Sequence, residues 1–105
     1  MALLDDVRTS LRVTSEMTDG EIQMWIDAAI ADMRRCGVDE LLLSEEALDP
    51  IAKSAVTCFV KANYGYDNSE APRFMEMYTM QLTALLNSDA NVRLRDYRDY
   101  DGEWQ

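Results

Sequence analysis

Side chains suited to catalysis are few in this chain. It has 105 residues and no His, so a Ser or Cys nucleophile lacks its usual base and any zinc site that uses His is excluded. Cys36 and Cys58 are the only thiols, and they do not form a Cys-x-x-Cys pair. We therefore expect two reduced structural thiols in a cytosolic setting, with no metal and no cofactor.

The carboxylates single out no catalytic site. Asp5 and Asp6 are neighbours in sequence, as are Glu45 and Glu46, so on a helix the members of each pair point in different directions. The Gly residues stand singly, so no Gly-rich loop is available to hold a phosphate. We expect that the protein is not an enzyme.

A basic row is the most informative polar group. Lys53, Thr57 and Lys61 are spaced by four, so they form one line along a helix, and they include both Lys of the chain. The row is either an ordinary solvated face or a subunit interface with the acidic residues 1–49 of a neighbouring copy. The second alternative joins two different surfaces and would generate a ring or a filament.

The charge is strongly acidic and uneven. The net charge is −10, and residues 1–49 carry twelve acids against four Arg. Such a protein does not bind a nucleic-acid backbone by releasing counterions. The acidity serves at least to keep a small protein soluble.

One helix organises the rest of the chain. Asp49 is suited to cap its first amides, Pro50 suits its first position, and Gly65 suits its end. Apolar residues cover most of its circumference, which predicts a central position in the domain. The predicted core residues of this helix are Ile51, Ala55, Phe59 and Ala62.

Three further helices are predicted around it. Leu4, Val7 and Leu11 indicate a short first helix, and apolar spacing over residues 19–36 indicates a second that closes at Gly37. Thr18 and Glu21 form a capping box at the start of the second helix. A fourth helix runs from about residue 69 to residue 87. The predicted fold is all-α, a small four-helix bundle over residues 1–88.

The methionines allow two interpretations. The chain has seven Met, and four of them are Met24, Met75, Met77 and Met80. They would either line an adaptable groove or fill the core of a small bundle. We favour the core.

Residues 89–105 form a C-terminal arm that differs from the body. They are densely charged, and Val92 and Leu94 alternate with Arg in a short pattern of period two. We expect this arm to be flexible in the monomer and to become ordered against a partner by adding a strand. Its predicted docking residues are Val92, Leu94, Tyr97 and Tyr100.

The N-terminal sequence and the hydropathy of the chain predict whether the protein is secreted or inserted into a membrane. The first six residues include two acids where a secretory signal has its basic region. The longest nearly apolar run, residues 55–60, is too short to span a membrane. We expect neither secretion nor membrane insertion.

With these residues laid out, the chain resembles the small head–tail connector (adaptor) proteins of tailed bacteriophages. The similarity covers about residues 3–88. It rests on the order of Leu-Leu-Asp-Asp-Val-Arg-Thr-Ser-Leu-Arg-Val, a polar link, a helix of the type Glu-Ile-x-x-x-Ile-x-Ala-Ala, Asp49-Pro50-Ile51, and Val60-Lys-Ala-Asn-Tyr-Gly-Tyr-Asp-Asn68 before a helix with Arg73-Phe74 and Tyr78. The arm after residue 87 departs from the family pattern.

The resemblance implies a structural protein of the virion, made in the host cytoplasm and located at the head–tail junction. Family members are four-helix subunits that form a ring, commonly of twelve copies, beneath the portal. The ring extends the DNA channel, through which DNA passes without specific binding, and it carries a stopper or tail-completion protein.

A function of another class fits the composition too. A small acidic helical module could regulate a basic protein partner by occupying that partner's nucleic-acid site. Such a module would be a monomer or dimer with a stoichiometric partner, whereas a connector would form rings.

Overall fold

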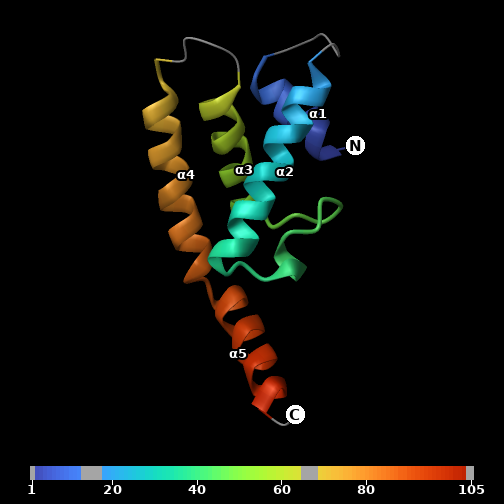
Figure 1. The fold of residues 1–105 in the computed structure, drawn as a ribbon, viewed down its shortest axis with the longest axis vertical. Helices are drawn as coiled ribbons and strands as arrows, with labels where there is room; N and C mark the ends of the chain where they lie inside the picture. Colours follow the sequence, from blue (N-terminus) through green and yellow to red (C-terminus); the bar gives the residue numbers. More distant parts are fainter. Residues whose placement is uncertain (1, 13–17, 65–68, 104–105) are drawn as a thin grey trace.

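The structure, a computed structural model, is all-helical over the residues it describes, which are 2–12, 18–64 and 69–103. No strand occurs among these residues, so the predicted all-α class is confirmed. The elements in chain order are α1 (Ala2–Ser10), α2 (Asp19–Cys36), the short 3₁₀ helix η1 (Glu40–Leu42), α3 (Pro50–Asn63), α4 (Ala71–Leu86) and α5 (Asp89–Glu103) (Figure 1).

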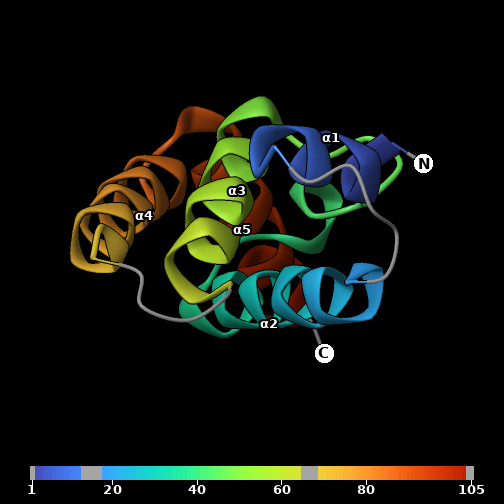
Figure 2. The same ribbon diagram turned by 90° about the horizontal axis from the view of Figure 1, so that it is seen from above.

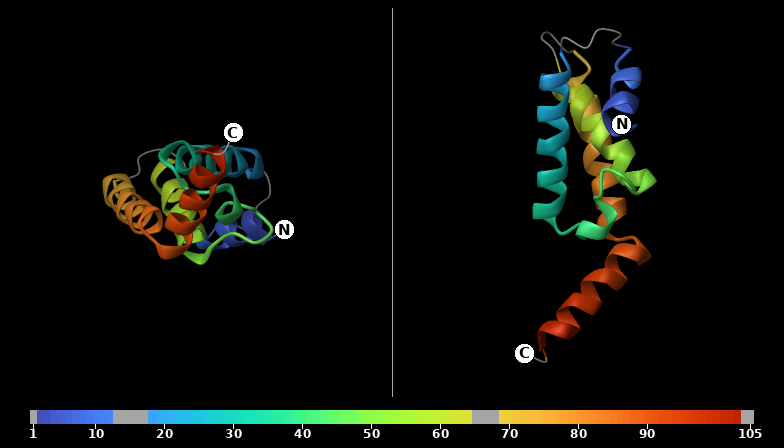
Figure 3. Two further views of the ribbon diagram at one scale, coloured as in Figure 1. Left: turned by 90° about the horizontal axis from the view of Figure 1, so that it is seen from below. Right: turned by 90° about the vertical axis from the view of Figure 1, so that its right-hand side faces the viewer.

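Helix α3 lies at the centre of the body. It packs on α4 along one side and on α2 along another, and α1 covers the remaining space between α2 and α3 (Figure 2). Helix α5 continues from the end of α4 and projects away from the other helices (Figure 3). The molecule is therefore elongated, with extents of 50 × 27 × 19 Å.

Helix α3 begins as the sequence predicts, with Asp49 as its cap and Pro50 in its first turn. The Asp49 carboxylate accepts hydrogen bonds from the backbone N–H groups of Ile51 and Ala52 at 2.9 and 3.2 Å, and Pro50 occupies the first turn. This satisfies amides that the helix itself cannot pair. The predicted closing residue, Gly65, lies outside the described residues.

The buried face of α3 consists mainly of small side chains. Ala55 and Ala62 are buried as predicted, together with Ala52, Val56, Cys58 and Val60. The prediction for Ile51 is wrong, since 42% of this residue is exposed. Ile51 lies in the first turn of α3, where the chain opens into a groove against the end of α4.

Phe59 is only half-buried, although it contacts two other aromatic rings. Its centroid lies 6.4 Å from that of Trp25 in α2 and 5.0 Å from that of Tyr78 in α4. Such tilted and edge-on pairs add to the area that the rings bury. The three rings tie together the helices on either side of α3.

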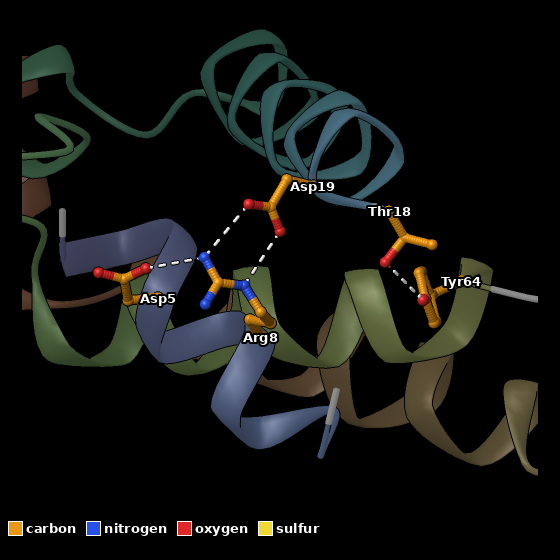
Figure 4. A network of polar contacts seen from close by, with 5 residues as sticks. All are labelled: Asp5, Arg8, Thr18, Asp19 and Tyr64. Carbon is orange, nitrogen blue, oxygen red and sulfur yellow. Dashed lines mark hydrogen bonds and ion pairs between the residues drawn. The ribbon is translucent and has the colours of Figure 1, made fainter. Parts of the chain in front are cut away.

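The two ends of α2 behave differently from each other. Gly37 closes the helix in the left-handed conformation, with φ at 116°, as predicted. The predicted capping box is wrong, because the Thr18 side chain makes no capping hydrogen bond. Its hydroxyl oxygen instead accepts a hydrogen bond from the Tyr64 hydroxyl at 2.9 Å (Figure 4). Thr18 therefore joins the start of α2 to the end of α3.

Arg8 fixes α1 to the same end of α2. Its guanidinium donates to both carboxylate oxygens of Asp19, at 3.0 and 3.2 Å, and to Asp5 at 3.0 Å (Figure 4). Two parallel bonds to one carboxylate hold the arginine in a defined orientation. The pair thus sets how the first helix lies on the second.

Tyr78 joins α4 to α2 through a buried hydroxyl. The residue is 3% exposed, and its hydroxyl donates to Asp32 Oδ2 at 2.6 Å. This hydrogen bond, together with the ion pair to Arg35, lowers the pKa of Asp32. Burial and the same bond raise the pKa of Tyr78, so the phenol stays protonated and remains the donor.

The conformation of residues 89–103 differs from the one predicted for the C-terminal arm. They form helix α5 in the single subunit, so the short period-two pattern does not form a strand there, and docking of the arm on a partner stays a prediction. The alternation of Val92 and Leu94 with Arg spans only four residues, and local helix signals override it. Ser88 Oγ accepts a hydrogen bond from the Asn91 N–H, and Asp89 lies in the first turn, where the helix dipole favours an acid.

Asn91 anchors α5 to the body. It is fully buried, and its amide oxygen accepts a hydrogen bond from the Asp39 N–H at 2.7 Å. Its amide nitrogen donates to the carbonyls of Gly37 and Leu86, both at 3.2 Å. One side chain thus connects α5 to the end of α4 and to the loop after α2.

Replacing Asn91 with Ala should lower the free energy of unfolding by about 1–3 kcal/mol, because the Asp39 N–H loses its acceptor in a buried place. Urea denaturation followed by circular dichroism would measure the change. Asn87→Ala is the matched control, since Asn87 is an exposed residue one turn earlier. Equal stabilities for the two variants would contradict the anchoring role.

Replacing Tyr78 with Phe should cost about 1.5–3 kcal/mol at pH 7, the range for a hydrogen bond to a charged group. The folded-state pKa of Asp32 lies below its ordinary value of 3.8. The stability due to this bond is therefore present above pH 3.8 and is lost as the pH falls through the folded pKa. The difference between wild type and variant should accordingly stay constant above pH 3.8 and shrink as the pH falls below that value.

Tyr64→Phe is the control for this pH dependence. Its hydroxyl bonds to the neutral Thr18, so its contribution should stay constant over the same range. A Tyr78→Phe difference that is equally constant would show that Asp32 is not the titrating partner.

Candidate assembly interface

The basic row is already engaged within the chain. Lys53 forms an ion pair with Asp6 of α1, and the Thr57 hydroxyl donates to the Lys53 carbonyl oxygen at 2.9 Å. The Lys61 ammonium lies over the Phe74 ring of α4, 5.4 Å from its centroid. The basic row does meet the acidic N-terminal segment at Lys53, but it meets that segment of its own chain. The Lys53 side chain remains 45% exposed, so water and a partner can still reach it.

Adjacent acids separate as their sequence positions predict. Asp5 pairs with Arg8, whereas Asp6 pairs with Lys53 on the other side of α1. Glu45 and Glu46 are both exposed in the loop before α3. Among the described residues, no group of three or more possible ligands is placed to hold a metal ion.

The two thiols have different surroundings. Cys58 is buried in α3, and that burial raises the pKa of its thiol. Cys36 is exposed at the end of α2, and both cysteines are free. Cys58 fits the predicted structural thiol, whereas Cys36 contributes nothing to the core.

The outer side of α4 exposes methionines. Met75, Met77 and Met80 are 36%, 37% and 68% exposed, and Met24 on α2 is 52% exposed. The prediction that these four fill the core is wrong. The helical stripe of Phe74, Tyr78, Leu82 and Leu85 already fills the space against α3, so the methionines on the other positions of α4 face outward.

A groove runs between this side of α4 and the first turns of α3. It has a volume of about 440 Å³, and it is bordered by exposed apolar atoms of Ile51 and Met80. Its remaining lining residues are Pro50, Ser54, Gln81 and Ala84. The composition contained a signal for this surface, because α4 has only two charged residues, Arg73 and Glu76, in a chain that is 29% charged.

Helix α5 offers a second accessible surface. Val92 is 40% exposed and Leu94 is half-buried, although both belong to the predicted docking residues. The side chains of Tyr97 and Tyr100 lie outside the described part of the structure. Of the predicted docking residues, the structure therefore places two near the root of α5.

The acidic surface, the apolar groove and the projecting helix are features of a protein that contacts other proteins. They offer no clustered nucleophile, base or metal ligand among the described side chains. None of the described helices is long and apolar enough to cross a membrane.

Comparison with known proteins identifies the family. No curated protein and no solved structure gave a significant match to the chain. A family model described as "Phage connector protein" matches residues 3–92, which include α1 to α4 and the root of α5. The match covers most of the 105 residues and agrees with the resemblance seen in the motifs. The chain therefore belongs to the phage connector protein family.

Proposed function

We propose that this protein is a structural subunit of the head–tail connector of a tailed bacteriophage. Copies of the chain, twelve in the virion, form a ring that docks beneath the portal, extends the DNA channel and joins the capsid to the tail through a stopper or tail-completion protein. The family match over residues 3–92 carries this proposal. It favours the connector over a small acidic module that regulates a basic partner.

The charge supports a channel that DNA crosses without binding. Acids lie on α1, on the outer side of α2 and in the loop before α3, and the net charge is −10. A ring of such subunits presents a surface with the same sign of charge as the DNA backbone. DNA would therefore pass without adhering to the protein.

Electron microscopy tests the proposal directly. Concentrated protein, alone and mixed with purified portal of the same phage, should show rings, and those rings should attach to one end of the portal. A stoichiometric complex with a basic protein, without rings under either condition, would support the regulatory module instead.

The basic row is a proposed part of the subunit interface. Replacing both Lys53 and Lys61 with Glu should shift the oligomers toward monomer in native mass spectrometry, because the acidic segment of a neighbour would then face added acids. An unchanged distribution of oligomers would remove the row from the interface.

A second variant separates this effect from folding. Lys53→Glu breaks the exposed pair with Asp6, which should cost at most about 1 kcal/mol. Adding Asp6→Lys restores an ion pair of opposite orientation within the chain. If the double exchange fully restored the oligomers, the row would act only inside the subunit.

The C-terminal segment is proposed to dock on the portal or on a neighbouring copy. Its truncation must keep Asn91, whose hydrogen bonds belong to the body of the protein. Removing residues 97–105 should leave the melting temperature nearly unchanged but reduce attachment to purified portal in a sedimentation assay. Attachment equal to that of the full chain would exclude residues 97–105 from docking.

A further inference from the structure

Arg12 has a backbone conformation that is unfavourable for its residue type. Helix α1 ends at Ser10, and the Arg12 N–H donates to the Thr9 carbonyl oxygen at 3.0 Å. The φ angle of Arg12 is 61°, and no other non-glycine residue among those described has a positive φ. In this left-handed conformation Cβ lies close to the following carbonyl oxygen, so glycine usually occupies such a place after a helix. An arginine there is less stable than a glycine would be.

No contact of the Arg12 side chain within the subunit compensates for this strain. The residue is exposed, and its guanidinium makes no hydrogen bond or ion pair with the described residues. The nearby acids are already used, because Arg8, one turn earlier on α1, pairs with both Asp5 and Asp19 (Figure 4). A strained backbone that is kept without a local benefit indicates that the side chain acts outside the subunit.

The other described cations do not combine these two features. Most of them form ion pairs within the subunit, namely Arg8, Arg34, Arg35, Lys53 and Arg73. Arg93 and Arg95 have no such pair among the described residues, but they lie in the regular helix α5, where the backbone suits an arginine. Arg12 is therefore the cation whose conformation needs an explanation.

The acids that lack a base lie on another part of the surface. Asp27 on α2 and Glu45 in the loop before α3 are exposed and form no ion pair with the described bases. The Gln23 amide nitrogen donates to Asp27 Oδ1 at 2.9 Å and to Glu45 Oε2 at 3.5 Å. This shared donor holds the two carboxylates close together, although they come from different elements.

A recess beside these two carboxylates suits an arginine side chain. It has a volume of about 310 Å³, and the buried residues Ile30 and Leu43 form its apolar part. Arg34 also borders it but is already paired with Glu40 at 3.3 Å. An arginine offers five N–H donors for the carboxylates and an aliphatic stem for the apolar part.

We propose that Arg12 of one copy binds the carboxylates of Asp27 and Glu45 in a second copy of this chain. Charge complementarity selects this partner: each subunit carries a net charge of −10, so copies repel one another unless an unpaired cation meets unpaired acids. The end of α1 and the middle of α2 are different surfaces, so repeating the contact gives a ring or a filament. The inference rests on the proposed function and adds a contact residue outside the basic row.

Arg12→Gly tests the contact, because it removes the strain and the cation together. In dilute solution the variant should need more urea than wild type to unfold. Its self-association should weaken about fivefold in sedimentation at low salt, as for the loss of one exposed ion pair. The difference in association should shrink as the salt concentration rises. Arg73→Gln is the control, since it removes the same charge from a cation that Glu70 already pairs.

An exchange of charges identifies the acceptor. Arg12→Glu should weaken self-association more than Arg12→Gly, because it brings an acid to the acids of the neighbour. Adding Glu45→Arg in the same chain should restore association, since every contact then again joins opposite charges. Arg12→Glu with Glu76→Arg is the matched control, because Glu76 is exposed on α4 and does not border the recess.

The results distinguish this inference from the proposed function. An Arg12→Gly variant that forms rings as readily as wild type, or an equal restoration by Glu76→Arg, would overturn the Arg12 contact and leave the connector function standing. Rings that are absent from the wild type, alone and on portal, would overturn both. A variant that unfolds at lower urea would show that Arg12 acts inside the subunit.

Two other partners of Arg12 would also overturn the inference. If Arg12→Gly kept its rings but no longer attached to purified portal, the acceptor would lie on the portal. If wild type bound double-stranded DNA in a gel-shift assay and Arg12→Gly did not, the acceptor would be a phosphate.

Discussion

The close packing of α3 between its neighbours is the constraint on which the rest of the structure depends. Its buried face is built from Ala52, Ala55 and Ala62 with medium-sized residues between them, so α2 and α4 can approach it closely. The larger groups come from the neighbours: Ile22, Ile26 and Met33 from α2, and Tyr78 and Leu85 from α4. A larger side chain at one of these alanines would separate the helices, because a packed core has little free volume.

This arrangement also determines which surfaces remain for partners. Since the stripe of α4 around Tyr78 and Leu82 is used against α3, Met77 and Met80 are left outside. The acids concentrate on the other side of the body, on α1, α2 and the loop before α3. One small subunit thus combines an acidic side that repels polyanions and a side with few charges that is suited to protein contact. This division agrees with the proposed position of the protein around a DNA channel.

Local signals in the sequence predicted the features that local chemistry determines. Asp49 and Gly37 act at the ends of helices as expected, because a cap involves only neighbouring residues. Thr18 was mispredicted because its partner, Tyr64, lies 46 residues away and competes for the same hydroxyl. The helical state of α5 depends partly on Asn91, whose contact with Asp39 spans 52 residues. The methionine surface was missed for the same kind of reason, since the composition of α4 does not say which of its apolar residues find a partner inside the subunit.

The anchoring of α5 by a single buried amide has a mechanical consequence. A helix of 15 residues acts as a rigid lever about 22 Å long, so a rotation of about 10° at its root would displace its tip by about 4 Å. Such a displacement is close to the spacing of atoms in contact and would misalign whatever the tip meets. Asn91 resists this rotation because its hydrogen bonds run to two separate backbone segments, the loop after α2 at Gly37 and Asp39 and the end of α4 at Leu86. The angular precision of an assembly built from this subunit would then be set by the stiffness of that one joint.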